Sequence, residues 1–128
     1  MSRLSIVAAV IFDENENRVF ITKRLPTAHQ AGFWEFPGGK VEENEENEQA
    51  LLRELKEELG IDVVKYQELC SFDYDYPNKP LHFTFYIVNK FNGNPYGREG
   101  QEGKWVKVID LKNQDFPEAN RIVLERIR

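Results

Sequence analysis

Residues 39–61 read GKVEENEENEQALLRELKEELGI, a stretch that joins a helical apolar pattern to regularly spaced acidic residues. Glu54, Glu57 and Glu58 stand at i, i+3 and i+4, positions that share one face of a helix. The leucines at positions 51, 52, 55 and 59 gather on another face. Packing of that apolar face would fix the rotation of the helix. The spacing therefore predicts a helix over residues 47–59 that aims three carboxylates in one direction.

These carboxylates predict a site for a hard divalent cation. Like charges at i and i+4 repel one another on a helix, and a cation between them relieves that repulsion. Oxygen ligands without neighbouring Cys or His suit Mg2+, which keeps water or phosphate oxygens in its remaining positions. We take Mn2+ as the alternative ion. The competing interpretation is a solvated acidic helix, since charge runs are usually only that.

Two neighbouring features, the glycine pair and Arg53, favour the functional interpretation. Gly38 and Gly39 allow a sharp turn and a close backbone approach to an ion. Arg53 offers a planar fork of donors that could hold the Glu54 carboxylate and favour its charged form. Gly60 can adopt the left-handed conformation that ends a helix. A solvated helix requires none of these features.

The same residues resemble the Nudix hydrolase signature, Gly-x5-Glu-x7-Arg-Glu-(apolar)-x-Glu-Glu-x-Gly-(apolar), at every specified position from Gly39 to Ile61. Outside this segment the chain is similar to the MutT branch of that family, whose members hydrolyse oxidised guanine nucleoside triphosphates. The similar motifs are FITKR at 20–24, AH at 28–29, EFPGGK at 35–40, GREGQ at 97–101, Trp105 and DFPEAN at 115–120.

The resemblance implies an α/β/α Nudix sandwich with a mixed β-sheet. It also implies an activity, in which water attacks a phosphorus of a nucleoside triphosphate under Mg2+ and releases pyrophosphate and a nucleoside monophosphate. A metal ion would let an acidic helix bind an anionic triphosphate. By resemblance, the metal shell comprises the Gly38 carbonyl, Glu54, Glu57, Glu58 and Glu99. Glu54 is the expected general base, and Arg53 the residue that orients it.

Further residues are expected to contact the substrate. They are Arg24, His29, Glu35, Phe36, Pro37, Gly38, Lys40, Lys79 and Asn120. Three of them have alternative roles: Lys79 as a solvated surface charge, His29 as a structural hydrogen-bond partner and Phe36 as a core residue. Glu99 of the expected metal shell has the same alternative as Lys79. The branch pattern would place an arginine at position 79.

The role of Asn120 affects which nucleotide base the protein is expected to recognise. An 8-oxoguanine carries a hydrogen at N7 beside O6, so one amide could accept from N7–H and donate to O6. Normal guanine has a lone pair at N7, which would leave the amide oxygen unsatisfied. The alternative is that Asn120 caps a terminal helix beginning near Arg121.

Length and composition narrow the function further. The 128 residues predict one domain, spanning 1–128, with a hydrophobic content of 41% that suffices for a core. A net charge of -5 without a basic stripe argues against polymeric DNA or RNA as a partner. The single cysteine, Cys70, is expected to be a buried, inert thiol. No segment is long enough to span a membrane, and we expect the cytoplasm as the default location. We also expect the protein to be a monomer.

Hydrophobic patterning predicts the remaining elements. Strands are expected near 5–12, 18–23, 34–39, 64–75, 81–91 and 104–108, with helices over 47–59 and 120–127. In the strand at 81–91, the alternation of Phe83, Phe85 and Ile87 predicts one buried face. His82, at the start of that strand, is expected to be structural.

Two other functions remain open from the sequence. One keeps the chemistry but takes CTP, dCTP or another nucleoside diphosphate derivative as substrate. The other is a non-catalytic Nudix-like module that binds nucleotides. Loss of the acidic residues would favour the second alternative, and here they are intact.

Overall fold

The computed structural model describes residues 3–26, 31–77 and 79–128 of the chain. Its described strands form a seven-stranded sheet. The strands are β1 (Leu4–Phe12), β2 (Arg18–Lys23), β3 (Trp34–Glu35), β4 (Gly38–Lys40), β5 (Asp62–Tyr76), β6 (Lys79–Asn92) and β7 (Gly103–Lys107). The helices are α1 (Asn47–Leu59) and α2 (Glu118–Ile127), with short 3-10 turns at Val108–Asp110 and Asn113–Asp115.

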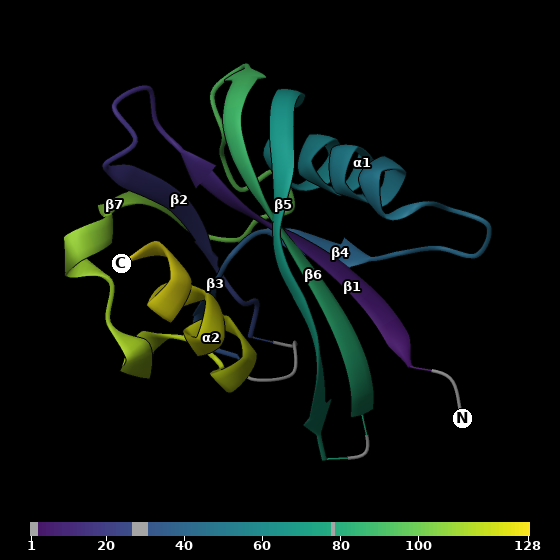
Figure 1. Cartoon of the computed structure of the whole chain (residues 1–128). Helices are drawn as coiled ribbons and strands as arrows, with labels where there is room; N and C mark the ends of the chain where they lie inside the picture. Colours follow the sequence, from purple (N-terminus) through teal and green to yellow (C-terminus); the bar gives the residue numbers. More distant parts are fainter. Residues whose placement is uncertain (1–2, 27–30, 78) are drawn as a thin grey trace.

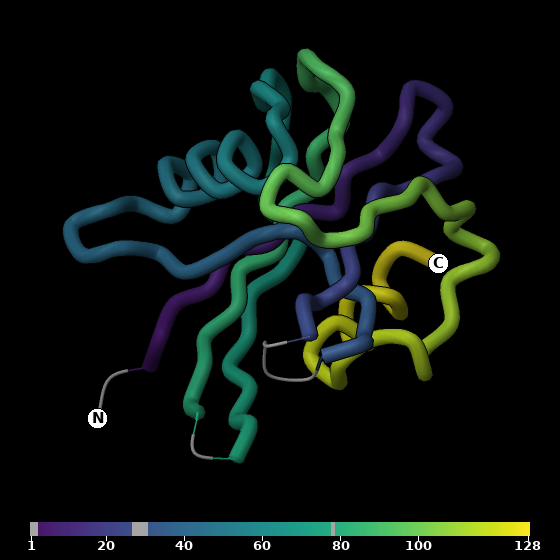
Figure 2. Tube along the Cα trace, turned by 180° about the vertical axis from the view of Figure 1, so that it is seen from behind, coloured from purple at the N-terminus to yellow at the C-terminus, as the bar shows by residue number. Residues whose placement is uncertain are grey.

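The sheet is mixed, as the family resemblance predicts. Its main strand order is β3-β2-β1-β6-β5, with β4 paired to β1 and β7 paired to β2. The β1–β6 pair is parallel, and the other pairs are antiparallel. The two helices lie on either side of the sheet (Figure 1), and the chain can be followed from behind in Figure 2. The predicted α/β/α sandwich is confirmed.

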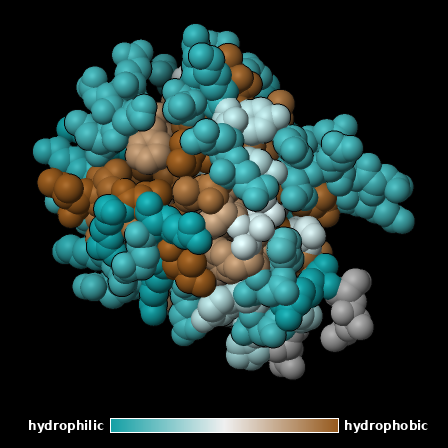
Figure 3. All heavy atoms as spheres, viewed as in Figure 1, coloured by the Kyte–Doolittle hydropathy of each residue, from teal (hydrophilic) through white to brown (hydrophobic). Residues whose placement is uncertain are grey.

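Two apolar clusters hold the layers together. Leu51, Leu55 and Leu59 of α1 pack with one side of β1 and β6. Val123 and Leu124 of α2 pack with the opposite side. In the view of Figure 3, hydrophilic residues cover most of the surface, and a hydrophobic area extends from the middle of the molecule to its left edge. Helices thus cover both sides of the central strands, and each strand needs apolar residues on both faces.

Two expectations about which side chains are buried are wrong. The strand at 81–91 has no single buried face, because Tyr86 and Val88 are buried on the side opposite to Phe83 and Phe85. The expected partner Ile87 is only partly buried. In α1, Leu52 is not part of the buried stripe, since 39% of it is exposed.

Element boundaries follow local chemistry. The prediction for α1 is confirmed at both ends, and Gly60 ends the helix with a φ of 73°. The strand expected at 34–39 is instead two short strands separated by Phe36 and Pro37. Proline has no N–H for a strand ladder, which favours a break there.

No helix in the described ranges has the length and apolar character needed to cross a membrane.

The terminal helix begins two residues earlier than expected. Its N-cap is Pro117 and its first residue is Glu118, so Asn120 lies within the first turn. The alternative role of Asn120 as a helix cap is therefore wrong. Proline suits the start of a helix because its fixed φ is compatible with helix entry and its missing N–H costs nothing there.

We predict that Leu55→Ala destabilises the fold far more than Leu52→Ala. Leu55 is fully buried and its truncation leaves a cavity, which costs about 2–5 kcal/mol. Leu52, on the same helix, should cost less than about 1 kcal/mol because it is part-exposed. Urea denaturation measures both values. Equal losses would contradict the described rotation of α1.

Candidate active site

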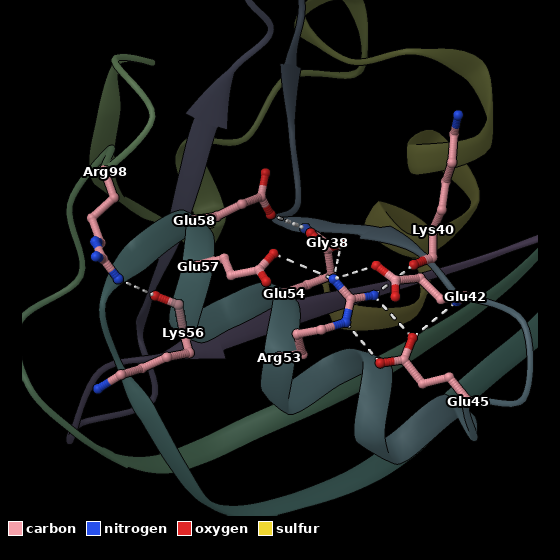
Figure 4. A network of polar contacts seen from close by, with 10 residues as sticks. All are labelled: Gly38, Lys40, Glu42, Glu45, Arg53, Glu54, Lys56, Glu57, Glu58 and Arg98. Atoms are coloured by element: carbon pink, nitrogen blue, oxygen red, sulfur yellow. Dashed lines mark hydrogen bonds and ion pairs between the residues drawn. The ribbon is translucent and has the colours of Figure 1, made fainter.

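The acidic side of α1 lies directly against the backbone of β4 (Figure 4). The Gly38 N–H donates a hydrogen bond of 3.0 Å to Oε2 of Glu58. A Cβ on Gly39 would lie only 2.3 Å from the carboxyl carbon of Glu54. A Cβ on Gly38 would meet the Val7 carbonyl oxygen of β1 at 1.9 Å. The glycine pair is therefore what lets β4 fit between β1 and the acids of α1.

Arg53 organises the charges around these acids. Its Nε and Nη2 donate to the two carboxylate oxygens of Glu45 at 2.7 and 2.9 Å. Its Nη1 donates to Glu54 at 2.8 Å, and Nη2 also reaches the Lys40 carbonyl at 3.0 Å. This bonding lowers the pKa of Glu45 to about 2, chiefly through the Arg53 hydrogen bonds. Arg53 thus links the loop before α1, the helix and β4.

The expected contact between Arg53 and Glu54 is present, but the paired contact with Glu45 was missed. Glu45 precedes the helix and lies eight positions before Arg53 in the sequence, so helical spacing does not place the two together. The available signal was the fixed position of Glu45 in the Gly-x5-Glu-x7-Arg pattern. A glutamate required at that spacing indicates a partner for the arginine.

Arg53 does not offset the cost of ionising Glu58 and Glu54. Burial, reinforced by the charges of Glu35, Glu54 and Glu99, raises the pKa of Glu58 to about 9. Burial also raises the pKa of Glu54, although the bond to Arg53 acts in the opposite direction. Arg53 was expected to favour the charged form of Glu54, and burial outweighs that effect. Ionising both groups would therefore be favoured by a nearby cation.

Glu57, the third acid on this side of α1, differs from Glu54 and Glu58 in its exposure. Glu57 leaves the same side of α1 as Glu54 and Glu58 (Figure 4), but 56% of its side chain is exposed. Its Oε2 lies 3.3 Å from Nη1 of Arg53. Within residues 3–26, 31–77 and 79–128, no three Asp, Glu, His or Cys side chains converge into a ready-made metal shell.

The loop that carries Glu99 is fastened to the end of α1. The Arg98 N–H donates to the Glu58 carbonyl at 2.9 Å, and the Tyr96 N–H to the Leu59 carbonyl at 3.3 Å. The Arg98 side chain donates to the Lys56 carbonyl at 2.9 Å (Figure 4). The two backbone bonds satisfy carbonyls that the end of a helix leaves without partners, whereas the Lys56 carbonyl also accepts the Gly60 N–H. The charge of Glu99 consequently acts on both Glu54 and Glu58.

A pocket of about 230 Å³ opens on the other side of the glycine pair. Several expected substrate residues line it, namely Arg24, Glu35, Phe36, Gly38, Lys40, Lys79 and Asn120. Pro37 is buried outside this lining, and its carbonyl accepts the Ala9 N–H at 2.8 Å. His29 lies outside the described residues.

The pocket is built on aromatic side chains. Phe36 is buried and stacks on Phe116 with ring centroids 5.4 Å apart. Phe85, on β6, meets Phe36 edge to face at 6.3 Å. Phe36 is therefore a core residue as well as a pocket residue, which makes its two expected roles compatible.

Asn120 and Arg24 supply polar groups to this pocket. Asn120 is 7% exposed, and its Oδ1 accepts the backbone N–H of Phe36 at 3.1 Å. Nη1 of Arg24 lies 2.6 Å from the Glu35 carboxylate. Glu35 also influences Glu58, so it joins the pocket to the acidic cluster. Sequence reasoning missed Tyr76, which lines the pocket near Asn120 because β5 extends to that residue.

Other residues lie away from the acidic cluster. His82 Nδ1 is 2.7 Å from Asp73, a contact between neighbouring strands that fits its structural role. Cys70 was expected to be buried, but it is only partly buried at the edge of the core, and burial raises the pKa of its thiol. A raised thiol pKa makes the reactive thiolate less available, as expected for an inert cysteine.

Comparison with known proteins places this arrangement among hydrolases. A model described as NUDIX domain matches residues 7–126. An 8-oxo-dGTP diphosphatase of Escherichia coli is 40% identical over 128 residues, covering 100% of this chain and 98% of the relative. A CTP pyrophosphohydrolase of E. coli is 36% identical and covers 98% of this chain and 91% of its own. A solved structure of MutT, from Aliivibrio salmonicida or Vibrio cholerae, is 51% identical with a TM-score of 0.88, covering 98% and 97% of the two chains.

We predict that Glu58→Gln stabilises the metal-free protein increasingly as pH rises. The folded-state pKa of about 9 exceeds the ordinary value of 4.5, so the folded protein binds more protons between these limits. Stability is then lost as pH rises through that window. Glutamine removes the titration and still accepts the Gly38 N–H. The gain in unfolding free energy should grow from near zero at about pH 5 to roughly 3 kcal/mol at about pH 8.

Urea denaturation in chelator at several pH values measures this difference. Glu48→Gln, an exposed acid on the same helix, is the matched control and should show no such trend. A gain for Glu58→Gln that does not change with pH would show that Glu58 titrates normally.

Proposed function

Because this chain belongs to the Nudix family of hydrolases, we propose that it hydrolyses 8-oxo-dGTP and related oxidised guanine nucleoside triphosphates with Mg2+. The products are the nucleoside monophosphate and pyrophosphate. Removing the oxidised nucleotide before a polymerase incorporates it would sanitise the nucleotide pool and prevent replication errors. The proposal that the base is an oxidised guanine rests on Asn120, whose buried side-chain amide lies on the wall of an aromatic pocket.

The contacts of Asn120 suit an 8-oxoguanine. Its Oδ1 already accepts the Phe36 N–H, and a carbonyl oxygen has a second lone pair that could accept N7–H. Its NH2 group could donate to O6 of the same base. A normal guanine offers no hydrogen at N7, so the amide oxygen would lose that partner. Sites built on such hydrogen bonds can discriminate by about 10^4 to 10^5.

The donor set suits a hard divalent cation, which Nudix hydrolases use. Glu54, Glu57 and Glu58 offer oxygen ligands from one side of α1, and two of them are partly buried with raised pKa values. We assign these acids, the Gly38 carbonyl and Glu99 to the metal shell. When bound, Mg2+ would offset the charge of the triphosphate and help activate water.

The protein's own groups have distinct proposed roles. Glu54 acts as general base, and its partly buried carboxylate is held by Arg53 at 2.8 Å. A raised pKa improves a carboxylate as a base near neutral pH. Lys40 and Lys79 line the pocket and could bind the phosphates, and Arg24 is held beside them by Glu35. His29 remains a proposed substrate contact.

We also propose the partner, domain organisation, oligomeric state and location of this chain. A net charge of -5 disfavours polymeric nucleic acid, so the proposed partner is the monomeric nucleotide. We propose a single domain over 1–128, because β1 and α2 pack into one core. A monomer in the cytoplasm, where the nucleotide pool is found, completes the proposal.

CTP is a second candidate substrate, because the chain is 36% identical to a CTP pyrophosphohydrolase. We expect kcat/KM for 8-oxo-dGTP to exceed that for dGTP and CTP by at least about a thousandfold. Asn120→Ala should reduce the preference over dGTP while leaving hydrolysis intact. Steady-state kinetics with the three nucleotides tests this. Equal use of dGTP and 8-oxo-dGTP would remove the oxidised-base assignment, and faster use of CTP would favour the alternative.

We predict that Glu54→Gln lowers kcat by about 10^2 to 10^4 at saturating Mg2+ with little loss of stability, because the base is lost while the side-chain shape is kept. Circular dichroism checks the fold, and released pyrophosphate measures turnover. Glu48→Gln is again the matched control. Near wild-type kcat for Glu54→Gln would remove Glu54 from the role of base.

A further inference from the structure

Two tyrosines near the end of β5 contact the first turn of α2. The Tyr74 hydroxyl donates to the side chain of Glu118, the first residue of the helix. The Tyr76 hydroxyl accepts the backbone N–H of Ala119 at 3.0 Å. Alternate residues of a strand point to one face, so both tyrosines reach the same helix end. Asn120 follows Ala119 directly.

The helix needs an acceptor at this position. The first N–H groups of a helix have no partner within the helix, and an N-cap side chain usually accepts one of them. Here the N-cap is Pro117, whose side chain has no acceptor, and α2 has no side-chain cap bond. The Asn120 N–H is satisfied by the Pro117 carbonyl at 3.0 Å. The Ala119 N–H is satisfied instead by Tyr76.

Burial makes this bond important. Ala119 is fully buried and Tyr76 is 9% exposed. Water therefore has little access to the Ala119 N–H if the hydroxyl is removed, and an unsatisfied buried donor is costly. The hydroxyl of Tyr76 does for α2 what a serine or aspartate at the N-cap would ordinarily do.

Asn120 is consequently held from two directions. Tyr76 fixes the backbone turn that carries it, and the Phe36 N–H fixes its Oδ1. Both contacting residues, Tyr76 and Phe36, line the pocket. A hydrogen bond to a base edge depends on placement, because such bonds weaken steeply with poor geometry.

We propose that Tyr76 is a positioning residue for base discrimination, which acts by holding the first turn of α2 so that Asn120 faces the pocket at the correct angle. This inference rests on the proposed function. The hydroxyl acts on the helix backbone rather than on the reacting phosphates, so its removal should affect recognition of the base and spare the chemical step.

The test is Tyr76→Phe, which removes one oxygen and keeps the ring. We expect the ratio of kcat/KM for 8-oxo-dGTP to that for dGTP to fall about tenfold, through a higher KM for 8-oxo-dGTP with kcat nearly unchanged. Hydrogen exchange at the Ala119 amide should become faster. Tyr74→Phe is the matched control, because its hydroxyl contacts a side chain rather than the helix backbone. It should leave the ratio within about twofold.

A rescue variant separates positioning from direct contact with the nucleotide. Pro117 has an extended backbone, with φ of -61° and ψ of 156°, which a serine can adopt at an N-cap. Pro117→Ser in the Tyr76→Phe background supplies a new acceptor for the Ala119 or Asn120 N–H. We expect it to recover most of the lost ratio, with Pro117→Ser alone as the reference.

Each outcome decides the inference. An unchanged ratio in Tyr76→Phe, with a wild type that discriminates, overturns it. A lower ratio without recovery by Pro117→Ser also overturns it, since the hydroxyl would then act on the nucleotide itself. Equal use of the two nucleotides by the wild type would instead overturn the proposed function, and the inference with it.

Discussion

The close approach of β4 to α1 is the constraint on which the site depends. Gly38 and Gly39 have no Cβ, and in their place lie the Val7 carbonyl and the Glu54 carboxyl group. The buried leucine face of α1 prevents the helix from rotating away. Two carboxylates are thereby held in a partly buried position that they would not occupy by themselves. Stability is given up locally at the position of the proposed cation site, and shifted pKa values are common at functional sites.

Arg53 forms ion pairs with acids of the site but does not neutralise all of them. Its strongest bonds go to Glu45, and it reaches Glu54 with one nitrogen. Glu58 has the Gly38 N–H as its partner, and its pKa remains high. An acidic site of this kind would repel a triphosphate. The proposed divalent ion would offset this repulsion and favour ionised Glu58, and we propose that the aromatic pocket across the glycine pair selects the base.

The sequence predicted the parts of this arrangement that local rules control. The bounds of α1 follow from its leucine spacing and from Gly60, and the common direction of Glu54, Glu57 and Glu58 follows from helical geometry. Contacts between distant segments could not be derived in this way. The Phe36 N–H bond to Asn120 joins residues 84 positions apart. Likewise, the cap that Tyr76 provides depends on where β5 ends relative to α2.

The local errors also have physical causes. Leu52 has the residue type of the apolar stripe, but it lies at the edge of the helix face that the sheet covers. The strand at 34–39 breaks because Phe36 and Pro37 make bonds outside the regular ladder, to Asn120 and Ala9. α2 starts at Glu118 because Pro117 is a suitable entry to a helix. In each case tertiary packing or proline chemistry outweighed periodicity.

Proton release on cation binding tests the central claim most directly. Mg2+ is titrated calorimetrically into the metal-free protein at about pH 8, in two buffers of different ionisation enthalpy, since ligands must lose protons to bind a metal. The account predicts that the wild type releases protons as the ion binds, and that Glu58→Gln releases distinctly fewer. Binding without any proton release would show that Glu58 is already ionised, and would contradict the proposed link between burial by β4 and the need for a cation.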